Sequence, residues 1–271
     1  MADQAFINEL NRWSEMLLEL NLIEAWCEGA IFPREMAFFM AHCQVVGVEQ
    51  IIESGRQDGY STRILGEFAR RTGIVIVSID YEDDKARGER CRQMLAPYTM
   101  DILTGDAFEE IGRVLKAKPM KTAVLIDGPK NWGAVSLLCA SASFRQVAVI
   151  SMHNLDEGYN TRPFFADLAD EPVYYEEYLE GYNEGAWARL SESEISFASS
   201  QGAARGGKRS TIGVLSVEHA DRDRIANASS GHFRTYPPKF VRWAWQTGNF
   251  GLLKLAFSAT NRWLGPEQYH E

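Results

Sequence analysis

The strongest constraint on the fold is a repeated unit in which a short apolar strand is followed by a helix. The first strand contains Ile51 and Ile52. The other predicted strands and helices cover residues 61–71, 74–80, 85–95, 100–103, 107–115, 122–127, 131–143 and 146–152. Continuous apolar strands that alternate with helices indicate a parallel sheet covered on both faces. We therefore expect a doubly wound α/β fold with a ligand crevice at the carboxyl ends of its strands.

The first unit carries the most distinctive motif. Its strand ends at Glu53, a loop with Gly55 and Gly59 follows, and Ser61 is expected to cap the next helix. Glycine suits positions where the backbone needs a positive φ or must lie close against a ligand. A helix N-terminus presents unpaired N–H groups and a partial positive charge. Together these features predict a pocket for a polar, nucleotide-like ligand.

The spacing in this loop is Glu-x-Gly-x-x-x-Gly, which differs from the Gly-x-Gly-x-x-Gly of dinucleotide-binding proteins. Residues 53–61 resemble motif I of class I S-adenosylmethionine-dependent methyltransferases, and the Gly-Tyr-Ser ending is similar to the small-molecule O-methyltransferase branch. The resemblance implies a mostly parallel, seven-stranded Rossmann-like sheet. It also implies S-adenosylmethionine as cofactor, bound by Glu53, Gly55, Gly59 and Ser61. The other interpretation is a structural turn whose glycines serve steric needs alone.

Two further acids follow predicted strands. Asp80 ends the second strand beside the glycine loop, where a carboxylate can accept both hydroxyls of a ribose. The resemblance implies this ribose-binding role for Asp80. Asp106 follows the third strand in a Gly-Asp-Ala turn that resembles the family's adenine-contacting loop. The other interpretation of Asp106 is a cap for the helix 107–115.

The candidate catalytic residues follow the fourth and fifth strands. In catechol-type O-methyltransferases a strand-four Asp is a magnesium ligand and a Lys three residues later is the base, and Asp127 and Lys130 have that spacing. The family's Asp-Asn pair after strand five is replaced here by His153-Asn154. Magnesium prefers oxygen ligands, whereas imidazole suits other metals. Two hypotheses stay open: a metal held by Asp127, His153 and Asn154, or a metal-free site with His153 as general base. We favour the second.

The activity expected from the resemblance is methyl transfer to a hydroxyl of a small molecule, such as a sugar or another natural product. The acceptor proton then has to leave, either to a general base or after a metal has lowered the hydroxyl pKa. Two alternatives stay open. The first is an enzyme that keeps this fold but performs other chemistry, since fold does not fix function. The second is a non-catalytic binding or scaffold protein.

We expect three regions: a helical N-terminal cap (1–45), the S-adenosylmethionine-binding domain (46–219) and a C-terminal extension (220–271). An apolar stripe with helical spacing runs through the cap: Phe6, Leu10, Trp13, Met16, Leu17 and Leu20. Core packing of this cap is favoured over a substrate lid.

Two segments near the end of the domain, 194–198 and 211–217, are predicted to be strands. As an antiparallel pair they would complete the seven-stranded sheet. The tyrosine-rich stretch before them, 156–190, is expected either to cover a substrate or to pack as a helix on the sheet.

The extension contains a basic, aromatic segment, 231–265. Its cations are Arg234, Lys239, Arg242, Lys254 and Arg262, and it has no acid. Such a segment can contact an anionic membrane surface, pack on the acidic remainder of the chain, or join two copies in a homodimer. Packing or dimerisation is favoured over peripheral membrane contact.

Composition narrows the setting. The formal net charge of −9 argues against general nucleic-acid binding, which needs a basic surface. The four cysteines are widely scattered, as expected for reduced thiols. No secretory signal or membrane-spanning run is recognisable, so we expect a cytoplasmic protein.

Overall fold

The computed structural model describes most of the first 200 residues and two short later segments. The described residues are 3–27, 29–82, 84–155, 162, 165, 168, 174–200, 212–217 and 222–225. The basic segment 231–265, most of the predicted extension 220–271 and most of the stretch 156–173 lie outside them.

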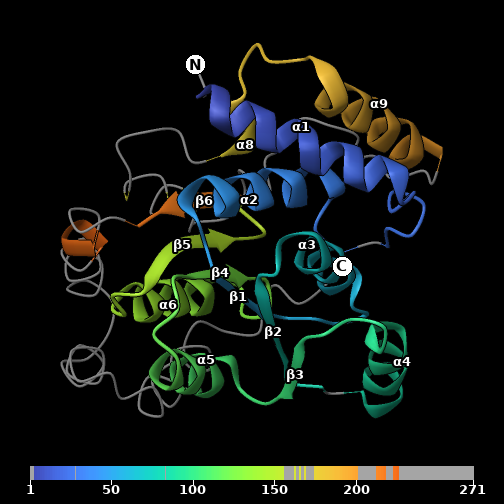
Figure 1. Cartoon of the computed structure of the whole chain (residues 1–271). Coiled ribbons are helices and arrows are strands. Elements are labelled where there is room, and N and C mark those ends of the chain that lie inside the picture. Colours follow the sequence, from blue (N-terminus) through green and yellow to red (C-terminus); the bar gives the residue numbers. More distant parts are fainter. Residues whose placement is uncertain are drawn as a thin grey trace.

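Six strands form one mixed sheet in the order β3-β2-β1-β4-β5-β6 (Figure 1). They are β1 (Gln50–Ser54), β2 (Val75–Asp80), β3 (Asp101–Thr104), β4 (Thr122–Ile126), β5 (Val147–Met152) and β6 (Gly213–Ser216). The first five are parallel to one another, and β6 is antiparallel to β5. The strand order reverses between β1 and β4. In open α/β sheets, ligands bind in the crevice at such a reversal.

Helices cover both faces of the sheet (Figure 1). Those described are α1 (Gln4–Glu19), α2 (Pro33–Val46), α3 (Tyr60–Thr72), α4 (Lys85–Leu95), α5 (Ala107–Ala117), α6 (Asn131–Ala142), α8 (Tyr175–Tyr178) and α9 (Gly185–Ser200). The five predicted parallel strands and the four helices between them are therefore confirmed, with boundaries that shift by at most two residues.

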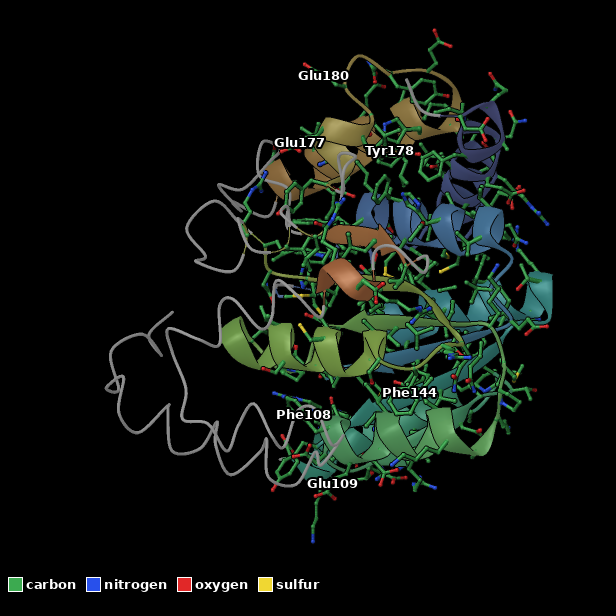
Figure 2. All side chains as sticks on the ribbon, turned by 90° about the vertical axis from the view of Figure 1, so that its left-hand side faces the viewer. Phe108, Glu109, Phe144, Glu177, Tyr178 and Glu180 are labelled. Carbon is green, nitrogen blue, oxygen red and sulfur yellow. The ribbon has the colours of Figure 1, made fainter. Side chains whose placement is uncertain are left out.

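Two apolar cores lie on opposite faces of the sheet because successive strand residues point to opposite sides. Ile51 packs in the core that α1, α2 and α3 share, and Ile52 packs in the core under α5 and α6. Figure 2 shows the two sides: Tyr178 of α8 lies near the first core, and Phe108 and Phe144 lie by the second. A doubly wound α/β architecture follows.

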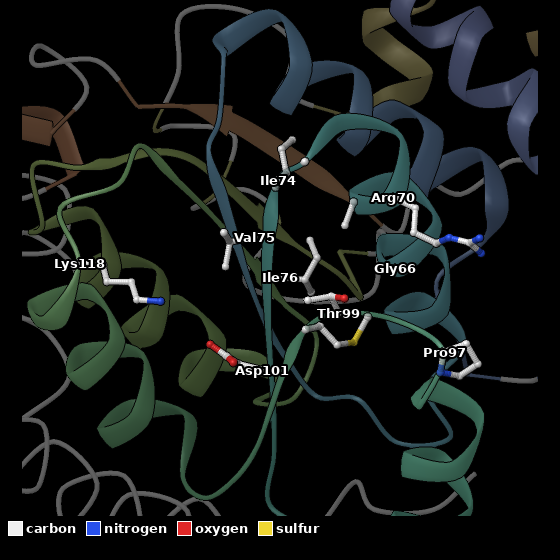
Figure 3. Close-up of a pocket in the computed structure, with 12 residues that line it drawn as sticks. Gly66, Arg70, Ile74, Val75, Ile76, Pro97, Thr99, Asp101 and Lys118 are labelled. Atoms are coloured by element: carbon white, nitrogen blue, oxygen red, sulfur yellow. The ribbon is translucent and has the colours of Figure 1, made fainter.

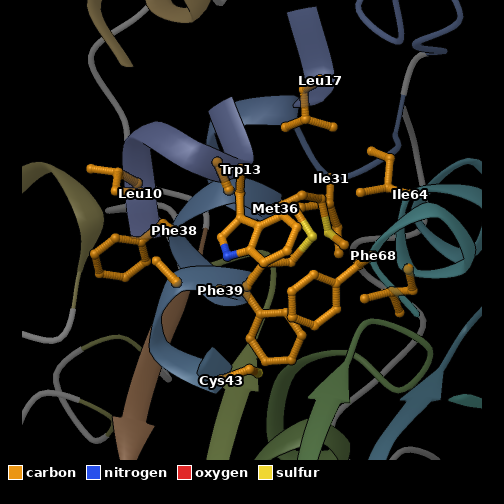
Figure 4. Packing of buried hydrophobic residues seen from close by; sticks show 14 of the residues in the cluster. Leu10, Trp13, Leu17, Ile31, Met36, Phe38, Phe39, Cys43, Ile64 and Phe68 are labelled. Atoms are coloured by element: carbon orange, nitrogen blue, oxygen red, sulfur yellow. The ribbon is translucent and has the colours of Figure 1, made fainter. Parts of the chain in front are cut away.

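The N-terminal helices belong to the first core. The predicted stripe of α1 is buried from Phe6 to Leu17, and α2, which lies between α1 and the sheet, is buried along most of its length. Trp13 of α1 meets Phe68 of α3 edge to face, with ring centroids 4.5 Å apart (Figure 4). The cap is thus part of the core, as expected for core packing.

The prediction of a seventh strand at 194–198 is wrong, because these residues lie within helix α9. A strand that buries Ile195 would expose Glu194, whereas Ile195 is 41% exposed and Glu194 is 3% exposed. The buried residues Trp187, Leu190 and Glu194 follow helical spacing. The described sheet therefore has six strands. The predicted strand 211–217 is confirmed in shorter form as β6.

Among the described residues, no helix is both long enough and apolar enough to cross a membrane.

Candidate functional site

The glycine loop after β1 adopts the predicted backbone. Gly55 and Gly59 both have left-handed conformations, with φ of 88° and 84°. A Cβ on Gly55 would lie 2.3 Å from the backbone nitrogen of Gly128, so the loop packs directly on the turn that follows β4. A Cβ on Gly59 would lie 2.6 Å from the Cys91 sulfur of α4. Each glycine is therefore required by close packing as well as by φ.

The prediction that Ser61 caps the following helix is wrong. Helix α3 begins at Tyr60, with Gly59 at the N-cap position. The Ser61 hydroxyl instead donates to Glu53 Oε1 at 2.5 Å. Because the helix begins one residue before Ser61, this serine is already inside the first turn, where its hydroxyl lies within reach of the buried Glu53 carboxylate.

Glu53 is fully buried beneath the loop. Besides Ser61, its carboxylate accepts hydrogen bonds from the hydroxyls of Thr62 and Ser78, at 2.5 and 2.6 Å. Burial raises the pKa of this carboxyl, and the three hydroxyls oppose that rise. Glu53 therefore joins β1, β2 and α3 from within. Direct contact between Glu53 and a cofactor stays a prediction.

Asp80 lies at the end of β2 beside the loop, as predicted. Its Oδ2 accepts the backbone N–H groups of Arg56 and Gln57, at 2.7 and 2.9 Å, and its Oδ1 accepts that of Glu82 at 2.8 Å. A carboxylate has about four lone-pair sites, so roughly one remains for a ligand hydroxyl. Asp80 is half-buried and fixes the shape of the loop.

Sequence reasoning missed an ionic cluster at the ends of β2 and β3. The Arg56 guanidinium, 2% exposed, donates to the Ser78 carbonyl at 3.0 Å and to Glu82 Oε1 at 2.6 Å. Arg92 of α4 donates to the same Glu82 carboxylate at 2.7 Å. Burial raises the Glu82 pKa, but Arg92 and Arg56 outweigh burial and lower it. The only signal in the sequence was an arginine inside the glycine motif.

Asp106 occupies the N-cap of α5, where its side chain accepts the Phe108 N–H at 2.9 Å. The capping interpretation of Asp106 is confirmed. Its predicted contact with adenine stays a prediction.

Four predicted residues form a polar cluster at the ends of β4 and β5: Asp127, Lys130, His153 and Asn154. The strands are neighbours in register, with Ile126 opposite Met152, so the residues that follow them meet. Asp127 Oδ1 receives both the His153 Nδ1 and the Lys130 Nζ at 2.8 Å. Lys130 also donates to the Asn154 Oδ1. We call these four residues the polar cluster.

Glu35, on the first turn of α2, was not predicted to belong to the site. Its Oε2 accepts the Phe32 N–H at 2.9 Å in a helix-capping contact and lies 3.6 Å from His153 Nε2. Both ring nitrogens of His153 therefore face carboxylates. A glutamate two residues after Pro33 is a helix-start signal in the sequence, but its proximity to His153 depends on how α2 packs.

Behind Glu35, the Arg34 side chain forms an ion pair with Glu194 of α9, with Nε and Oε1 2.7 Å apart. The Glu194 carboxylate also accepts the Arg34 backbone N–H at 2.9 Å. Burial raises the Glu194 pKa, against the lowering effect of Arg34. This pair fixes the first turn of α2, and with it Glu35, above the polar cluster.

Charge and exposure distinguish the members of the cluster. Burial lowers the His153 pKa, but Asp127 and Glu35 outweigh it and raise the pKa above its usual value. Burial raises the Asp127 pKa, but His153 and Lys130 outweigh it and lower the pKa. The Lys130 side chain is 37% exposed, against 10% for Asp127 and 4% for His153. Lys130 is therefore the member that a ligand can reach most easily.

The resemblance raises the question of a divalent metal. Within the described part of the chain, no group of three or more His, Cys, Asp and Glu side chains is arranged to hold one. Two of the proposed ligands, Asp127 and Asn154, are partners of the Lys130 ammonium, and His153 Nδ1 donates to the same Asp127 oxygen. A divalent ion on that oxygen would be repelled by the nearby ammonium. This arrangement does not fit a metal.

A pocket of about 570 Å³ opens at the opposite end of the sheet (Figure 3). Its walls come from the end of α3, the start of β2 and the residues before β3, including Arg70, Ile74 and Asp101. Asp80 ends β2, whereas Ile74 precedes it. This pocket is therefore separate from the predicted site.

No family model matches the sequence, and no curated protein matches it. Structural neighbours are S-adenosylmethionine-dependent O-methyltransferases. One from Bacillus cereus, in complex with SAH, is 16% identical, with a TM-score of 0.42 over 76% of this chain and 91% of that chain. One from Streptomyces achromogenes, involved in tomaymycin synthesis and in complex with SAM, is 12% identical, with a TM-score of 0.42 over 79% of this chain and 89% of that chain.

A putative O-methyltransferase from Klebsiella pneumoniae is 12% identical, with a TM-score of 0.42 over 80% of this chain and 91% of that chain. Identities this low and TM-scores below 0.5 do not establish an activity for this chain. Its activity therefore has to be argued from its own residues.

Proposed function

We propose that the chain is an S-adenosylmethionine-dependent methyltransferase that acts on a hydroxyl of a small molecule, such as a sugar or another natural product. The observation that carries this proposal is the contact between the glycine loop and the polar cluster. Gly55 packs against Gly128, the residue that follows Asp127. A cofactor on the loop and an acceptor at the cluster would therefore be neighbours, as methyl transfer requires.

The residues around the loop fit the proposed cofactor. Asp80 keeps about one lone-pair site for a ribose hydroxyl, and the N-terminus of α3 offers unpaired backbone N–H groups to a carboxylate. The missing side chain at Gly55 lets the loop lie directly against the turn after β4, beside Asp127. When bound, S-adenosylmethionine supplies an electrophilic methyl group on a sulfonium.

In this proposal the polar cluster positions the acceptor oxygen. Asp127 uses only Oδ1 for Lys130 and His153, and its Oδ2 has no hydrogen-bond partner among the described residues. Lys130 stabilises the developing charge on the acceptor oxygen through its own positive charge, while Asp127 Oδ2 accepts the hydroxyl hydrogen and takes the proton as the new bond forms. His153 holds Asp127 through Oδ1. The His153 ring is almost fully buried and therefore less accessible to an acceptor. Its role as general base stays a prediction.

Titration calorimetry with S-adenosylmethionine and S-adenosylhomocysteine tests the proposal. We expect both to bind, and we expect Asp80→Ala to weaken each by about tenfold or more because it removes a charged acceptor. Asp84→Ala is the matched control, since Asp84 follows the same strand but caps α4 at the surface. Failure of the wild-type chain to bind either compound would overturn the proposal.

Activity assays separate the roles within the cluster. If Lys130 contacts the acceptor, Lys130→Ala should lower kcat more than His153→Ala does. The opposite ranking would return the role of base to His153. Binding of both compounds without methyl transfer to any hydroxyl would favour other chemistry on this fold.

A further inference from the structure

Lys130 is surrounded by oxygen atoms. Its Nζ lies 2.6 Å from the Asp127 carbonyl oxygen and 2.8 Å from Asp127 Oδ1, and it also donates to the Asn154 Oδ1. An ammonium has three N–H donors, so these three acceptors use all of them. A carboxylate, a backbone carbonyl and an amide oxygen are also the ligands that a hard divalent cation takes in proteins. The ammonium therefore lies among ligands suited to a metal.

The backbone is shaped to maintain this arrangement. Asn154 has a φ of 60°, a left-handed conformation that is uncommon for a residue other than glycine. Asn154 lies two residues after the end of β5, and its side-chain amide contacts Lys130. The neighbouring His153 side chain contacts Asp127. Such local strain persists only where the surrounding contacts impose it, and it concentrates at functional sites.

Two carboxylates lie close to Lys130 and its neighbour His153. Asp127 faces it from the end of β4, and Glu35 faces His153 from α2. The Lys130 ammonium therefore offsets part of the charge of two carboxylates. Without the Lys130 charge, the same set would be net negative in either protonation state of His153 and would attract a cation.

We propose that the Lys130 ammonium takes the place of a divalent cation in this site, so that the acceptor oxygen is activated by a side-chain cation. This inference rests on the proposed function for its catalytic meaning. The structural claim stands apart from activity: removing the ammonium should convert the polar cluster into a metal site. In that site Asp127 and Asn154 would supply the oxygen ligands.

Manganese binding, followed by electron paramagnetic resonance and calorimetry, tests this claim. We expect the wild-type chain to bind Mn²⁺ at least about tenfold more weakly than Lys130→Ala does. Adding Asp127→Asn to Lys130→Ala should abolish the gain, because it removes the charged ligand. Lys118→Ala is the matched control: this lysine is exposed at the end of α5, so its loss should leave Mn²⁺ binding unchanged.

Two outcomes would overturn the inference. The first is Mn²⁺ binding by the wild-type chain that Asp127→Asn abolishes. The second is a folded Lys130→Ala chain, verified by circular dichroism, that gains no Mn²⁺ affinity. The Mn²⁺ measurement on the wild-type chain needs no substitution at Lys130. It can therefore overturn the inference even if the Lys130→Ala chain fails to fold. Neither readout depends on methyl transfer, and failure of the proposed function would appear separately, as failure to bind S-adenosylmethionine.

Discussion

At the scale of residues, three strand-end carboxylates have three different sets of partners. Glu53 contacts hydroxyls, Asp80 contacts backbone N–H groups, and Asp127 contacts the side chains of Lys130 and His153. His153 and Lys130 lower the Asp127 pKa, whereas burial raises that of Glu53. Acidic residues at the same edge of the sheet therefore have different roles: Glu53 supports the core, Asp80 shapes the loop, and Asp127 belongs to the polar cluster.

Glu53→Ala is expected to destabilise the fold. The substitution removes the common acceptor of three buried hydroxyls, so the free energy of unfolding should fall by about 1–3 kcal/mol. Glu53→Gln should cost less, because an amide keeps a hydrogen-bonding group there without a buried charge. Urea denaturation measures both. Glu109→Ala, at an exposed position of α5, is the control, and an equal loss there would contradict the prediction.

His153 should make stability depend on pH. Its pKa is raised by Asp127 and Glu35, so the folded chain binds the proton more tightly than the unfolded chain does. This contribution is fully present below about pH 6.5, the usual histidine value, and disappears as the pH rises through the raised pKa. Asp127, whose pKa is lowered, should stay charged through that window.

Urea denaturation of the wild-type chain and His153→Gln, from about pH 6 to about pH 9, checks this expectation. The wild-type advantage in unfolding free energy should shrink as the pH rises. An advantage that grows with pH would show that His153 is neutral in the folded chain.

At the scale of elements, the conformation of the glycine loop depends on the turn that packs against it. Gly55 and Gly73 have similar left-handed φ values, 88° and 79°. A Cβ on Gly55 would collide with the backbone of the turn after β4, whereas one on Gly73 would meet nothing within 4 Å. Loop and turn therefore form one packed unit at the switch point of the sheet.

This pair of glycines provides a matched experiment. Gly73→Ala should cost about 1–2 kcal/mol in unfolding free energy, because only the left-handed strain is added. Gly55→Ala adds a clash between two backbone segments, so its cost should exceed about 3 kcal/mol. Thermal and urea denaturation measure both. Equal costs would show that the loop can move away from Gly128.

Over the whole molecule, the N-terminal helices complete one of the two cores. Large buried side chains from α1 and α2, among them Trp13, Phe38 and Phe39, cover the face of the sheet above α3 (Figure 4). The same helices bring Glu35 to the polar cluster. Fold stability and site composition are thus coupled through this layer.

Removal of residues 1–45 should therefore abolish cooperative folding. Burial of each large apolar side chain contributes about 1.5–3 kcal/mol, and loss of several exceeds a typical stability of about 5–15 kcal/mol. Circular dichroism and urea denaturation of the truncated chain test this expectation. A truncated chain that unfolds cooperatively at the same urea concentration as the full chain would contradict it.

The sequence alone determined the five parallel strands with the four helices between them, the left-handed glycines and the residues that meet at the ends of β4 and β5. These features depend on local signals: apolar β-branched runs, glycine, and polar residues at strand ends, whose positions in a parallel sheet follow from strand order. Asp127, Lys130, His153 and Asn154 were therefore predicted together.

Only the tertiary structure decided the rest. Residues 194–198 lie in helix α9, and Glu194 pairs there with Arg34, 160 positions away in the chain. Glu35 joins His153, and Arg56 joins Glu82, through the packing of separate elements. Such pairings depend on three-dimensional proximity that no local pattern encodes. Each pairing offsets the free-energy cost of burying a charged side chain. These contacts therefore depend on how the elements pack and not on the helix or strand propensity of single residues.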